Sequence, residues 1–469
     1  MSYDFDEIDR IVNARSLAVV GASNSPTKFG YMFTRSQVTM GFDGPLYLVN
    51  PKEDEIMGRR SYPDIRSLPQ APDLVYLTIP AHRSMEVLKD CAEVGVKAVI
   101  ITASGFREIG ERGKALEAEA LEISRAGGFR IIGPNCFGIY NPRNGLTLLP
   151  GHDFSTRTGD VAFISQSGGY SAHVARQAKS LGIDFSAVIS YGNAADLDES
   201  DFLRYFTDDP ETAIITAYVE GARDGARFAE ALKAAASAKP VVIWKVGKEE
   251  SSRRAVISHT GSLAGSPALW DALIKQSGAI EASGVDELLD IVLALKYIGR
   301  GKARRLLISG GGGGLGAYGA DLAEREGLEV PDLDPATLSR MQDVLDRAGA
   351  VAGNPLDIGA PLIPVPFLEG ALREAALNPT TEVLVFDLAV NFGYDVAGDF
   401  GIERAVEILC DARKVSGRPV VAVLYSRSFD PDDMRFETMI RRMRKRLNAG
   451  GVLVFPTMAR AVRALGRLS

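Results

Sequence analysis

The chain opens with short apolar runs that alternate with longer amphipathic segments. Five runs predict buried strands because they are rich in Val, Ile and Leu and end in Gly, Pro, Asn or Ser. They are 17–23, 45–51, 74–80, 97–105 and 129–135. Between them, 84–95 and 113–128 carry apolar residues at helical spacing. Parallel strands need such crossover helices, so the pattern predicts a doubly wound parallel sheet over about the first 145 residues.

The same alternation restarts twice further along the chain. A second set of strands is predicted at 159–169, 185–193, 212–221 and 239–247, with a helix at 223–238. A third set is predicted at 304–314, 382–391, 419–425 and 451–456. The sequence therefore predicts an α/β fold of three tandem doubly wound parallel-sheet domains, which we place at 1–150, 151–302 and 303–469.

Composition bears on the compartment and excludes some partners. The 469 residues carry 53 basic and 60 acidic side chains, a net charge of −7 with no basic block, so we expect neither nucleic acid nor membrane as a partner. Cys91, Cys136 and Cys410 lie far apart, which fits a reducing compartment and offers no metal-ligand spacing. The acidic start lacks a signal-peptide core, and no run approaches about 18 apolar residues. We therefore expect a cytoplasmic protein without a metal site.

The predicted strand ends of the first domain carry small residues. Ligands of open parallel sheets bind beyond the carboxyl ends of the strands, where helix N-termini favour anions. Gly21-Ala22-Ser23 stands where a dinucleotide fingerprint has G-x-G, and the next strand ends at Lys52 rather than at an acidic ribose contact. This arrangement disfavours NAD and favours a phosphate. Each strand end taken alone also fits an ordinary turn.

The second domain combines an anion site with a histidine. Ser165-Gln166-Ser167-Gly168 lies where a predicted strand meets a helix, so backbone N–H groups and two hydroxyls converge on the positive end of a helix dipole. His259 lies in a Ser/Thr/Gly-rich segment that we expect to be a turn, and a neutral imidazole with small neighbours can attack phosphorus. Glu220, at the end of a preceding strand, could hold the other imidazole N–H. Taken alone, His259 also fits a solvated residue, and Glu220 a charge paired with an arginine.

Three other features carry weaker signals. His82 follows a predicted strand and fits an exposed position as well as a ligand contact. His152 and His173 receive no role, although His173 lies just beyond the Ser165–Gly168 turn. Gly310–Gly314 resembles a phosphate cradle, but no Lys-Ser/Thr pair follows it, so we predict a flexible strand-to-helix turn rather than a P-loop.

Taken in order, these segments resemble a known family. VGAS (20–23), VNPK (49–52), IPA (79–81), SGF-x-E (104–108) and GPNC-x-G (133–138) resemble the CoA-binding domain of the NDP-forming acyl-CoA synthetases, a superfamily that includes succinyl-CoA synthetase and the ADP-forming acetyl-CoA synthetases. The resemblance continues through SQSG (165–168), YVEG (218–221), SHTGSLAG (258–265) and NPLD (354–357), and so covers nearly the whole chain. SHTGSLAG is its most specific element.

The resemblance implies a Rossmann-like CoA-binding domain followed by two flavodoxin-like domains. In the family, an acyl-CoA and phosphate give an acyl phosphate and CoA; the acyl phosphate then phosphorylates a histidine, which passes the phosphoryl group to ADP or GDP. By this resemblance His259 is phosphorylated, Glu220 stabilises it, and Ser165, Gln166, Ser167 and Gly168 bind the phosphate. Coenzyme A is expected at Gly21, Ala22, Ser23, Lys28, Asn50, Pro51, Lys52, Pro80, Ala81, Ser104, Gly105 and Asn135.

The family places its nucleotide site in an ATP-grasp domain, for which we find no counterpart in this sequence. We therefore expect a separate ATP-grasp β chain that binds ATP or ADP with Mg²⁺, an α₂β₂ assembly, and a small carboxylic acid as substrate. A specialised homologue that works alone, a CoA-binding regulatory protein and a carbamoyl-transferring relative stay open as alternatives. Tyr191 places an aromatic ring where the family pattern has a small residue; if its loop lines the acyl pocket, the acid differs from acetate.

Overall fold

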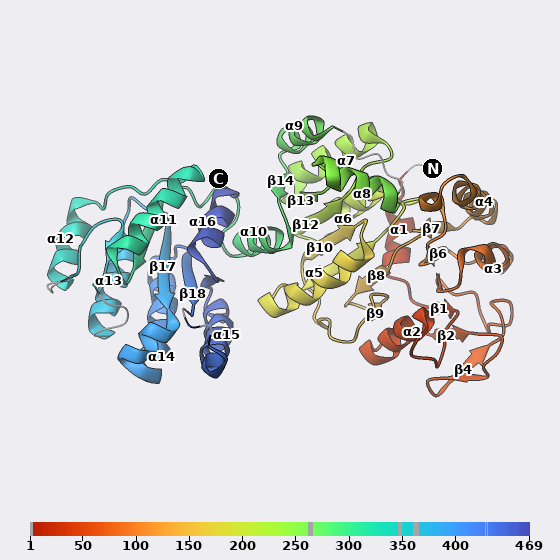
Figure 1. Ribbon diagram of the computed structural model, residues 1–469, viewed down its shortest axis with the longest axis horizontal. Helices are drawn as coiled ribbons and strands as arrows, with labels where there is room; N and C mark the ends of the chain where they lie inside the picture. The colour runs from red at the N-terminus through yellow and green to blue at the C-terminus, as the bar shows by residue number, and fades with distance from the viewer. Residues whose placement is uncertain (1–2, 261–265, 346–348, 360–364, 427, 429) are drawn as a thin grey trace. The chain divides into compact units, whose positions relative to one another are not determined.

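The computed structural model describes residues 3–260, 266–345, 349–359, 365–426, 428 and 430–469. The chain separates into two compact units, Met1–Leu288 and Leu289–Ser469. Over these residues the strands form three sheets in which parallel pairs predominate, and helices connect many of the successive strands (Figure 1). The predicted α/β class with three sheets is confirmed, whereas the proposed domain boundaries at 150 and 302 stay a prediction.

The first sheet has the strand order β3-β4-β2-β1-β5-β6-β7, and its pairs are parallel except β3–β4. Its strands are β1 (Leu17–Val20), β2 (Leu46–Val49), β3 (Glu55–Ile56), β4 (Arg59–Tyr62), β5 (Leu74–Leu77), β6 (Ala98–Ile101) and β7 (Arg130–Ile132). Its helices are α1 (Phe5–Val12), α2 (Phe29–Met40), α3 (Ala81–Val94), the 3₁₀ helix η1 (Arg107–Ile109) and α4 (Glu111–Gly127). Since α2, α3 and α4 begin beyond the carboxyl ends of β1, β5 and β6, their N-termini gather at one edge of the sheet.

The second sheet has the order β14-β13-β12-β10-β11-β8-β9, with β8 and β9 antiparallel. Its strands are β8 (Gly138–Asn141), β9 (Leu146–Thr147), β10 (Val161–Ser165), β11 (Phe185–Ser190), β12 (Ile214–Val219), β13 (Val241–Lys245) and β14 (Ile280–Ala282). The helices are α5 (Gly168–Leu181), α6 (Glu199–Asp208), α7 (Gly225–Ala238), α8 (Glu250–Thr260) and α9 (Pro267–Ser277), and the following α10 (Val285–Tyr297) spans the boundary between the two units in the sequence. Strands β10, β12 and β13 end side by side, which places the loops after them at one edge.

The third sheet, in the unit Leu289–Ser469, is parallel throughout, with the order β16-β15-β17-β18-β19. Its strands are β15 (Leu306–Gly310), β16 (Leu356–Asp357), β17 (Val383–Ala389), β18 (Val420–Tyr425) and β19 (Leu453–Phe455). Its helices are α11 (Gly313–Arg325), α12 (Pro335–Val344), α13 (Val365–Leu377), α14 (Val390–Ser416), the 3₁₀ helix η2 (Pro431–Asp433), α15 (Met434–Ala449) and α16 (Met458–Gly466). A separate core containing Leu307, Phe386 and Leu409 holds this sheet to its helices.

One hydrophobic core runs through both sheets of the unit Met1–Leu288. It contains Phe33 and Tyr76 from the first sheet and its helices, together with Ile164 and Phe202 from the second. Full burial of one large apolar side chain contributes about 1.5–3 kcal/mol. The shared core therefore makes the two sheets a single compact unit.

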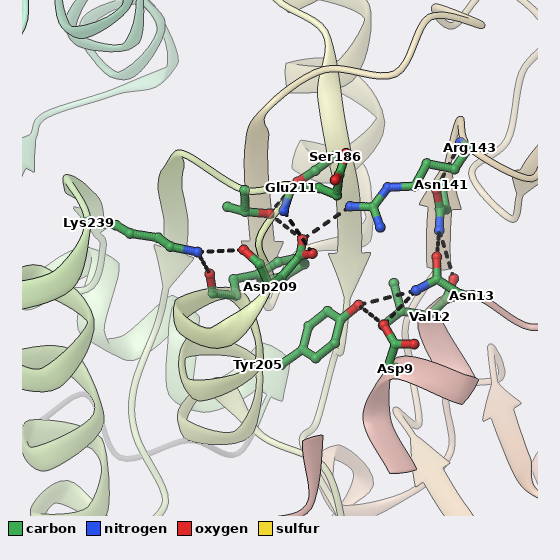
Figure 2. Close-up of polar contacts among 12 residues, drawn as sticks. Asp9, Val12, Asn13, Asn141, Arg143, Ser186, Tyr205, Asp209, Glu211 and Lys239 are labelled. Atoms are coloured by element: carbon green, nitrogen blue, oxygen red, sulfur yellow. Dashed lines mark hydrogen bonds and ion pairs between the residues drawn. The ribbon is translucent and has the colours of Figure 1, made fainter. Parts of the chain in front are cut away.

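Buried polar contacts join α1 to the second sheet and its helix α6 (Figure 2). The carboxylate of Asp9 accepts hydrogen bonds from the Tyr205 hydroxyl (2.9 Å) and the Asn13 amide (2.7 Å). The Asn141 amide donates to the carbonyl oxygen of Val12 (2.9 Å) and to Asn13 Oδ1 (2.8 Å). These bonds hold the N-terminal helix, and with it β1, against the second sheet.

Two ion-pair clusters also connect α1 and the end of α6 to other segments of this unit. Arg143 donates to Asp209 at the end of α6 (3.1 Å; Figure 2). The Arg130 guanidinium, whose side chain is only 7% exposed, bonds Glu7 of α1 (2.6 Å) and forms a two-pronged contact with Asp196 (2.8 and 2.9 Å). Since Asp196 lies in the loop between β11 and α6, Arg130 connects three segments that are far apart in the sequence.

The sequence prediction differs from the structure mainly at short elements. It missed the antiparallel pairs β3–β4 and β8–β9, because strands of two to four residues offer too little alternation to be recognised. The helices predicted at 84–95, 113–128 and 223–238 correspond to α3, α4 and α7 within three residues at each end. Among the described residues, no helix has both the length and the apolar character needed to cross a membrane.

Candidate functional site

Two adjoining cavities lie at the carboxyl edge of the first sheet. The first has a volume of about 780 Å³ and is lined, among others, by Gly21, Ser23, Lys28, Asn50, Pro51 and Lys52. The second has a volume of about 650 Å³ and is lined, among others, by Phe33, Ala81, Ser104, Gly105, Asn135 and Phe137. Both include Phe29, Thr78, Ile79 and Pro80 in their walls. One extended ligand can therefore occupy the two cavities together.

The structure brings together the residues expected to bind CoA, with one exception. All of them line the two cavities except Ala22. Ala22 is fully buried, and its carbonyl oxygen accepts a hydrogen bond from the Asn50 amide at 2.8 Å. Its contribution is therefore to the shape of the turn after β1 and not to the wall of a cavity.

Two glycines let α2 start close to the end of β1. Gly21 has φ +87°, and a Cβ there would lie 2.8 Å from Thr78 Oγ1 and from Ile79 Cγ2. A Cβ on Gly30 would lie 1.9 Å from the carbonyl oxygen of Gly21. Only glycine fits this close approach, which directs the N-terminus of α2 toward the first cavity.

The first cavity carries charges of both signs. Its cationic side chains are Lys28, Lys52 and Arg83. Its carboxylates are Asp64, Glu86 and Asp90. Asp90 is paired with Arg66 at 2.6 Å, which offsets its negative charge. The first cavity therefore offers local positive charge at its cationic side chains and is not positive throughout. Sequence reasoning missed Arg83, although its position in the first turn of a helix after a strand end is a usable signal; its neighbour His82 lines the second cavity.

The turn between β10 and α5 is shaped by its own hydroxyls. Ser165 Oγ donates to the carbonyl oxygen of Ser167 (2.8 Å) and accepts the Ser167 N–H (3.1 Å), while Ser167 Oγ caps α5 by accepting the N–H of Tyr170 (3.4 Å). At Gly168, the first residue of α5, a Cβ would come within 2.9 Å of the Phe137 ring. Because Phe137 lines the second cavity, the N-terminus of α5 lies beside that cavity.

Gln166 turns its amide away from this turn and toward the end of β12. Gln166 Oε1 accepts the N–H groups of Glu220 and of Gly221, the latter at 3.0 Å, and Nε2 donates to the Gly221 carbonyl oxygen at 3.0 Å. Glu220 follows β12 directly and is 4% exposed, and the Tyr218 hydroxyl donates to its Oε1 at 3.2 Å. The structure thus joins Gln166 to Glu220, while the hydroxyl-bearing residues shape the turn.

His259 lies in the last turn of α8 and not in the turn that its Ser, Thr and Gly neighbours predicted. The arginines and aliphatic residues that precede it continue the helix through Thr260, and the small polar residues at its end are too weak a signal to stop it earlier. The His259 side chain and the remainder of the motif, 261–265, lie outside the described residues. Its pairing with Glu220 stays a prediction.

A hydrogen-bonded chain connects the second cavity to the second sheet. Glu108 Oε1 accepts the Phe106 N–H (3.1 Å), and its Oε2 accepts the Asn193 amide (2.7 Å). The Asn135 amide donates to Asn193 Oδ1 at 3.4 Å. Asn193, which is 1% exposed, was not identified as a site residue from the sequence, although it is the last residue of the strand predicted at 185–193.

Three further sequence features find a place in the structure. Tyr191 is fully buried, with its ring 5.8 Å from that of Phe202, and it lines neither cavity. The Gly310–Gly314 run joins β15 to α11, which confirms a strand-to-helix turn. Within the described ranges, no group of three His, Cys, Asp or Glu side chains could hold a metal ion.

This fold and site define an α/β protein with a CoA-binding region and a ligase-like region. Residues 15–142 match the family model described as a CoA binding domain, and residues 158–295 match the model of a succinyl-CoA ligase like flavodoxin domain. The first match contains every residue that lines the two cavities. The second contains the Ser165–Gly168 turn, Glu220 and α8.

Relatives that match over most of the chain identify the family. The alpha subunit of ADP-forming acetate–CoA ligase II of Pyrococcus furiosus is 38% identical over 423 residues, which cover 89% of each chain. The alpha subunit of ligase I of the same organism is 34% identical and covers 98% of this chain and 97% of that one. The solved structure of the dinucleotide forming acetyl-coenzyme A synthetase 1 of Candidatus Korarchaeum cryptofilum, in complex with phosphate and ADP, matches with a TM-score of 0.83 at 29% identity, covering 98% of this chain and 96% of that one. The chain belongs to the family of ADP-forming acyl-CoA ligase alpha subunits and is an acid–thiol ligase.

Proposed function

We propose that this chain is the α chain of an NDP-forming acyl-CoA synthetase that joins a small carboxylic acid to CoA through an acyl phosphate and a phosphohistidine at His259. The contact between Phe137 and Gly168 carries the proposal, because it places the second cavity beside the N-terminus of α5. A thioester held in that cavity would lie next to a site suited to phosphate.

The two cavities suggest how CoA lies. Lys28, Lys52 and Arg83 of the first cavity suit the phosphates of the nucleotide end. The second cavity, whose wall combines Phe33, Phe137 and other apolar residues with polar ones such as Arg112, suits the uncharged pantetheine arm, which carries amides along an apolar chain. The thiol end then reaches Asn135 and Phe137.

The reaction is reversible, and in the direction that cleaves the thioester it has three steps. Phosphate attacks the acyl carbon of acyl-CoA, so that a C–O bond forms, the C–S bond breaks and CoA leaves as the thiol. The neutral imidazole of His259 then attacks phosphorus, and the acid leaves as its carboxylate. When the imidazole nitrogen bonds phosphorus, the ring becomes positively charged. The Glu220 carboxylate stabilises this charge. ADP accepts the phosphoryl group in the last step.

A partner chain completes the reaction. The Pyrococcus relatives are named alpha subunits, which supports a β subunit here. The ADP-forming acetate–CoA ligase I of Archaeoglobus fulgidus is 37% identical over 352 residues, which are 75% of this chain but only 50% of that longer chain. We infer that a β chain of the ATP-grasp type binds ATP or ADP with Mg²⁺, in an α₂β₂ assembly. The purified α chain should then form negligible acyl-CoA until a β chain is added. Full turnover by the α chain alone would contradict the requirement for a partner chain.

Labelling tests the nucleophile. The assembled enzyme should incorporate ³²P from radioactive ATP as an acid-labile, base-stable phosphate, and His259→Ala should abolish it. Glu220→Gln keeps the shape but removes the charge, and should slow labelling by about 10²-fold, which corresponds to about 2.7 kcal/mol. An acid-labile phosphate that persists in His259→Ala would move the nucleophile elsewhere, with His173 the first residue to test.

Calorimetry tests the CoA site. The isolated chain should bind CoA in preference to NAD, and Lys52→Ala should weaken that binding. Tight NAD binding without a response to CoA would overturn the assignment of the first domain. CoA binding without any labelling of His259 would instead favour a regulatory CoA-binding protein.

A further inference from the structure

Glu220 occupies a position where the sheet no longer holds the backbone. Strand β12 ends at Val219, whose carbonyl oxygen accepts the last N–H from the neighbouring β13 side, that of Val246 (3.1 Å). The Glu220 N–H instead donates to Gln166 Oε1, a side-chain acceptor on the loop after β10. Gly221 bonds the same amide through both its N–H (3.0 Å) and its carbonyl oxygen (3.0 Å). The side-chain amide of Gln166 therefore supplies the hydrogen bonds that a neighbouring strand would make to the backbone of Glu220 and Gly221.

A buried lysine holds the other side of the same residue. Lys245 Nζ, at the end of β13, donates to the carbonyl oxygen of Glu220 at 2.8 Å and to that of Val246. The ammonium also lies 4.7 Å from the centre of the Trp270 ring. Lys245 is 5% exposed, and burial, together with the charge of Lys248, lowers its pKa to about 8.

Burying the Lys245 ammonium group lowers the stability of the folded chain, which indicates that the group has a specific role at this position. Desolvating an ammonium group disfavours folding, and an apolar side chain of similar length would fill the same space without that cost. Gln166 is 4% exposed, and its buried amide likewise makes hydrogen bonds to the main chain of two consecutive residues, Glu220 and Gly221. Both groups converge on the main chain of Glu220, whose carboxylate is held in turn by the Tyr218 hydroxyl (3.2 Å).

We propose that Gln166 and Lys245 are positioning residues that orient the Glu220 carboxylate by fixing the peptide groups on either side of it. The inference rests on the proposed function, in which Glu220 stabilises the phosphorylated histidine. It also changes the role of Gln166, because an amide committed to Glu220 and Gly221 is not free to turn toward phosphate. Loss of either residue should therefore slow phosphoryl transfer and leave phosphate binding intact.

The test measures ³²P-phosphate incorporation by the assembled enzyme with acetyl-CoA, as a function of phosphate concentration. Gln166→Met keeps the length of the side chain and removes its polar atoms, and Lys245→Met does the same for the lysine. Each should lower the maximal rate about tenfold, as expected for the loss of a buried hydrogen-bonding group, with KM for phosphate changed less than twofold. Ser167→Ala is the matched control from the same turn and should act mainly on KM for phosphate.

A double variant gives a readout that a merely structural role would not produce. If Gln166 acts through Glu220, then Gln166→Met combined with Glu220→Gln should be no slower than Glu220→Gln alone. A multiplied loss, or a tenfold higher KM for phosphate with an unchanged maximal rate, would overturn the inference. If Gln166→Met does not fold, as judged by its CoA titration, Lys245→Met tests the same inference. A wild-type enzyme that labels at His259 while both variants match it would contradict this inference alone, whereas a wild type that labels neither from acetyl-CoA with phosphate nor from ATP contradicts the proposed function.

Discussion

The turns after β10 and β15 share a backbone plan but differ in chemistry. Both leave a parallel strand and enter a helix, α5 or α11, and each has a nearby carboxylate bonded by a tyrosine hydroxyl: Glu220 by Tyr218 (3.2 Å) and Asp387 by Tyr425 (2.8 Å). After β10, Ser165 and Ser167 shape the turn and Gln166 reaches β12. After β15, the turn is a run of glycines, and α11 has no side-chain cap. Topology therefore prepares an edge, and side chains decide its chemistry.

Two ion-pair groups, one in each compact unit, differ in how far their side chains are buried. Arg130 is 7% exposed in its cluster, whereas the pair Arg305–Glu382 (3.1 Å) has side chains that are 44% and 33% exposed. Buried pairs are costly to break, and exposed pairs contribute little. The following predictions test this contrast between the two units.

The largest effect is expected at Arg130. Arg130→Met leaves Glu7 and Asp196 without their guanidinium partner and should lower the free energy of unfolding of the first unit by about 3–5 kcal/mol. Arg305→Met is the matched control in the second unit and should lower stability by about 1 kcal/mol or less. Denaturant unfolding of the full chain measures both. Equal losses would show that burial does not distinguish the two pairs.

The next effect concerns pH and a carboxylate of α6. Glu199 is fully buried, and burial, with the charge of Asp198, raises its pKa to about 8. A carboxyl group whose pKa is higher in the folded chain stabilises it below the unfolded value of 4.5, and this contribution is lost as the pH rises toward 8. Glu199→Gln does not ionise, so its stability relative to the wild type should increase between pH 5 and pH 8 by on the order of a few kcal/mol.

Glu382 provides the opposite case in the second unit. Burial alone would raise its pKa, but the N–H groups of Arg305 and Arg304 and the Arg305 guanidinium outweigh it and lower the pKa. Its contribution to stability is therefore present at neutral pH and lost as the pH falls below about 4.5. In thermal melts from pH 3 to pH 9, Glu382→Gln should be less stable than the wild type above about pH 4.5 and approach it at lower pH, whereas Glu199→Gln should become more stable than the wild type as the pH rises toward 8. Parallel curves would contradict both assignments.

The smallest effect compares the two turns directly. A methyl group at Gly168 meets the Phe137 ring at 2.9 Å, so Gly168→Ala should cost about 1–2 kcal/mol and weaken CoA binding, because Phe137 lines the second cavity. A Cβ at Gly314, in the first turn of α11, meets nothing within 4 Å. Gly314→Ala should therefore stabilise its unit by about 0.5–1 kcal/mol. Calorimetry with CoA and thermal melts measure the pair, and a neutral Gly168→Ala would mean that the close contact relaxes freely.

The sequence by itself determined the α/β class, the three sheets and the grouping at one sheet edge of most residues that we expected to bind CoA. Alternation of apolar runs with amphipathic segments is a local property, and in parallel sheets it places every strand end at a ligand-binding edge. Pro80, Ser104 and Asn135 could thus be assigned to one region before the cavities that they line were known.

Only the tertiary structure decided which of these residues contact one another. Gln166 belongs to a motif that we expected to bind phosphate, yet its amide makes hydrogen bonds to Glu220 and Gly221, 54 and 55 positions away. Lys245 lies within the strand predicted at 239–247, and only the structure shows that its ammonium group bonds the Glu220 carbonyl oxygen. Local pattern reports the class of a side chain and its periodicity, whereas hydrogen-bond partners distant in sequence depend on strand order and register, which arise only when the whole sheet assembles.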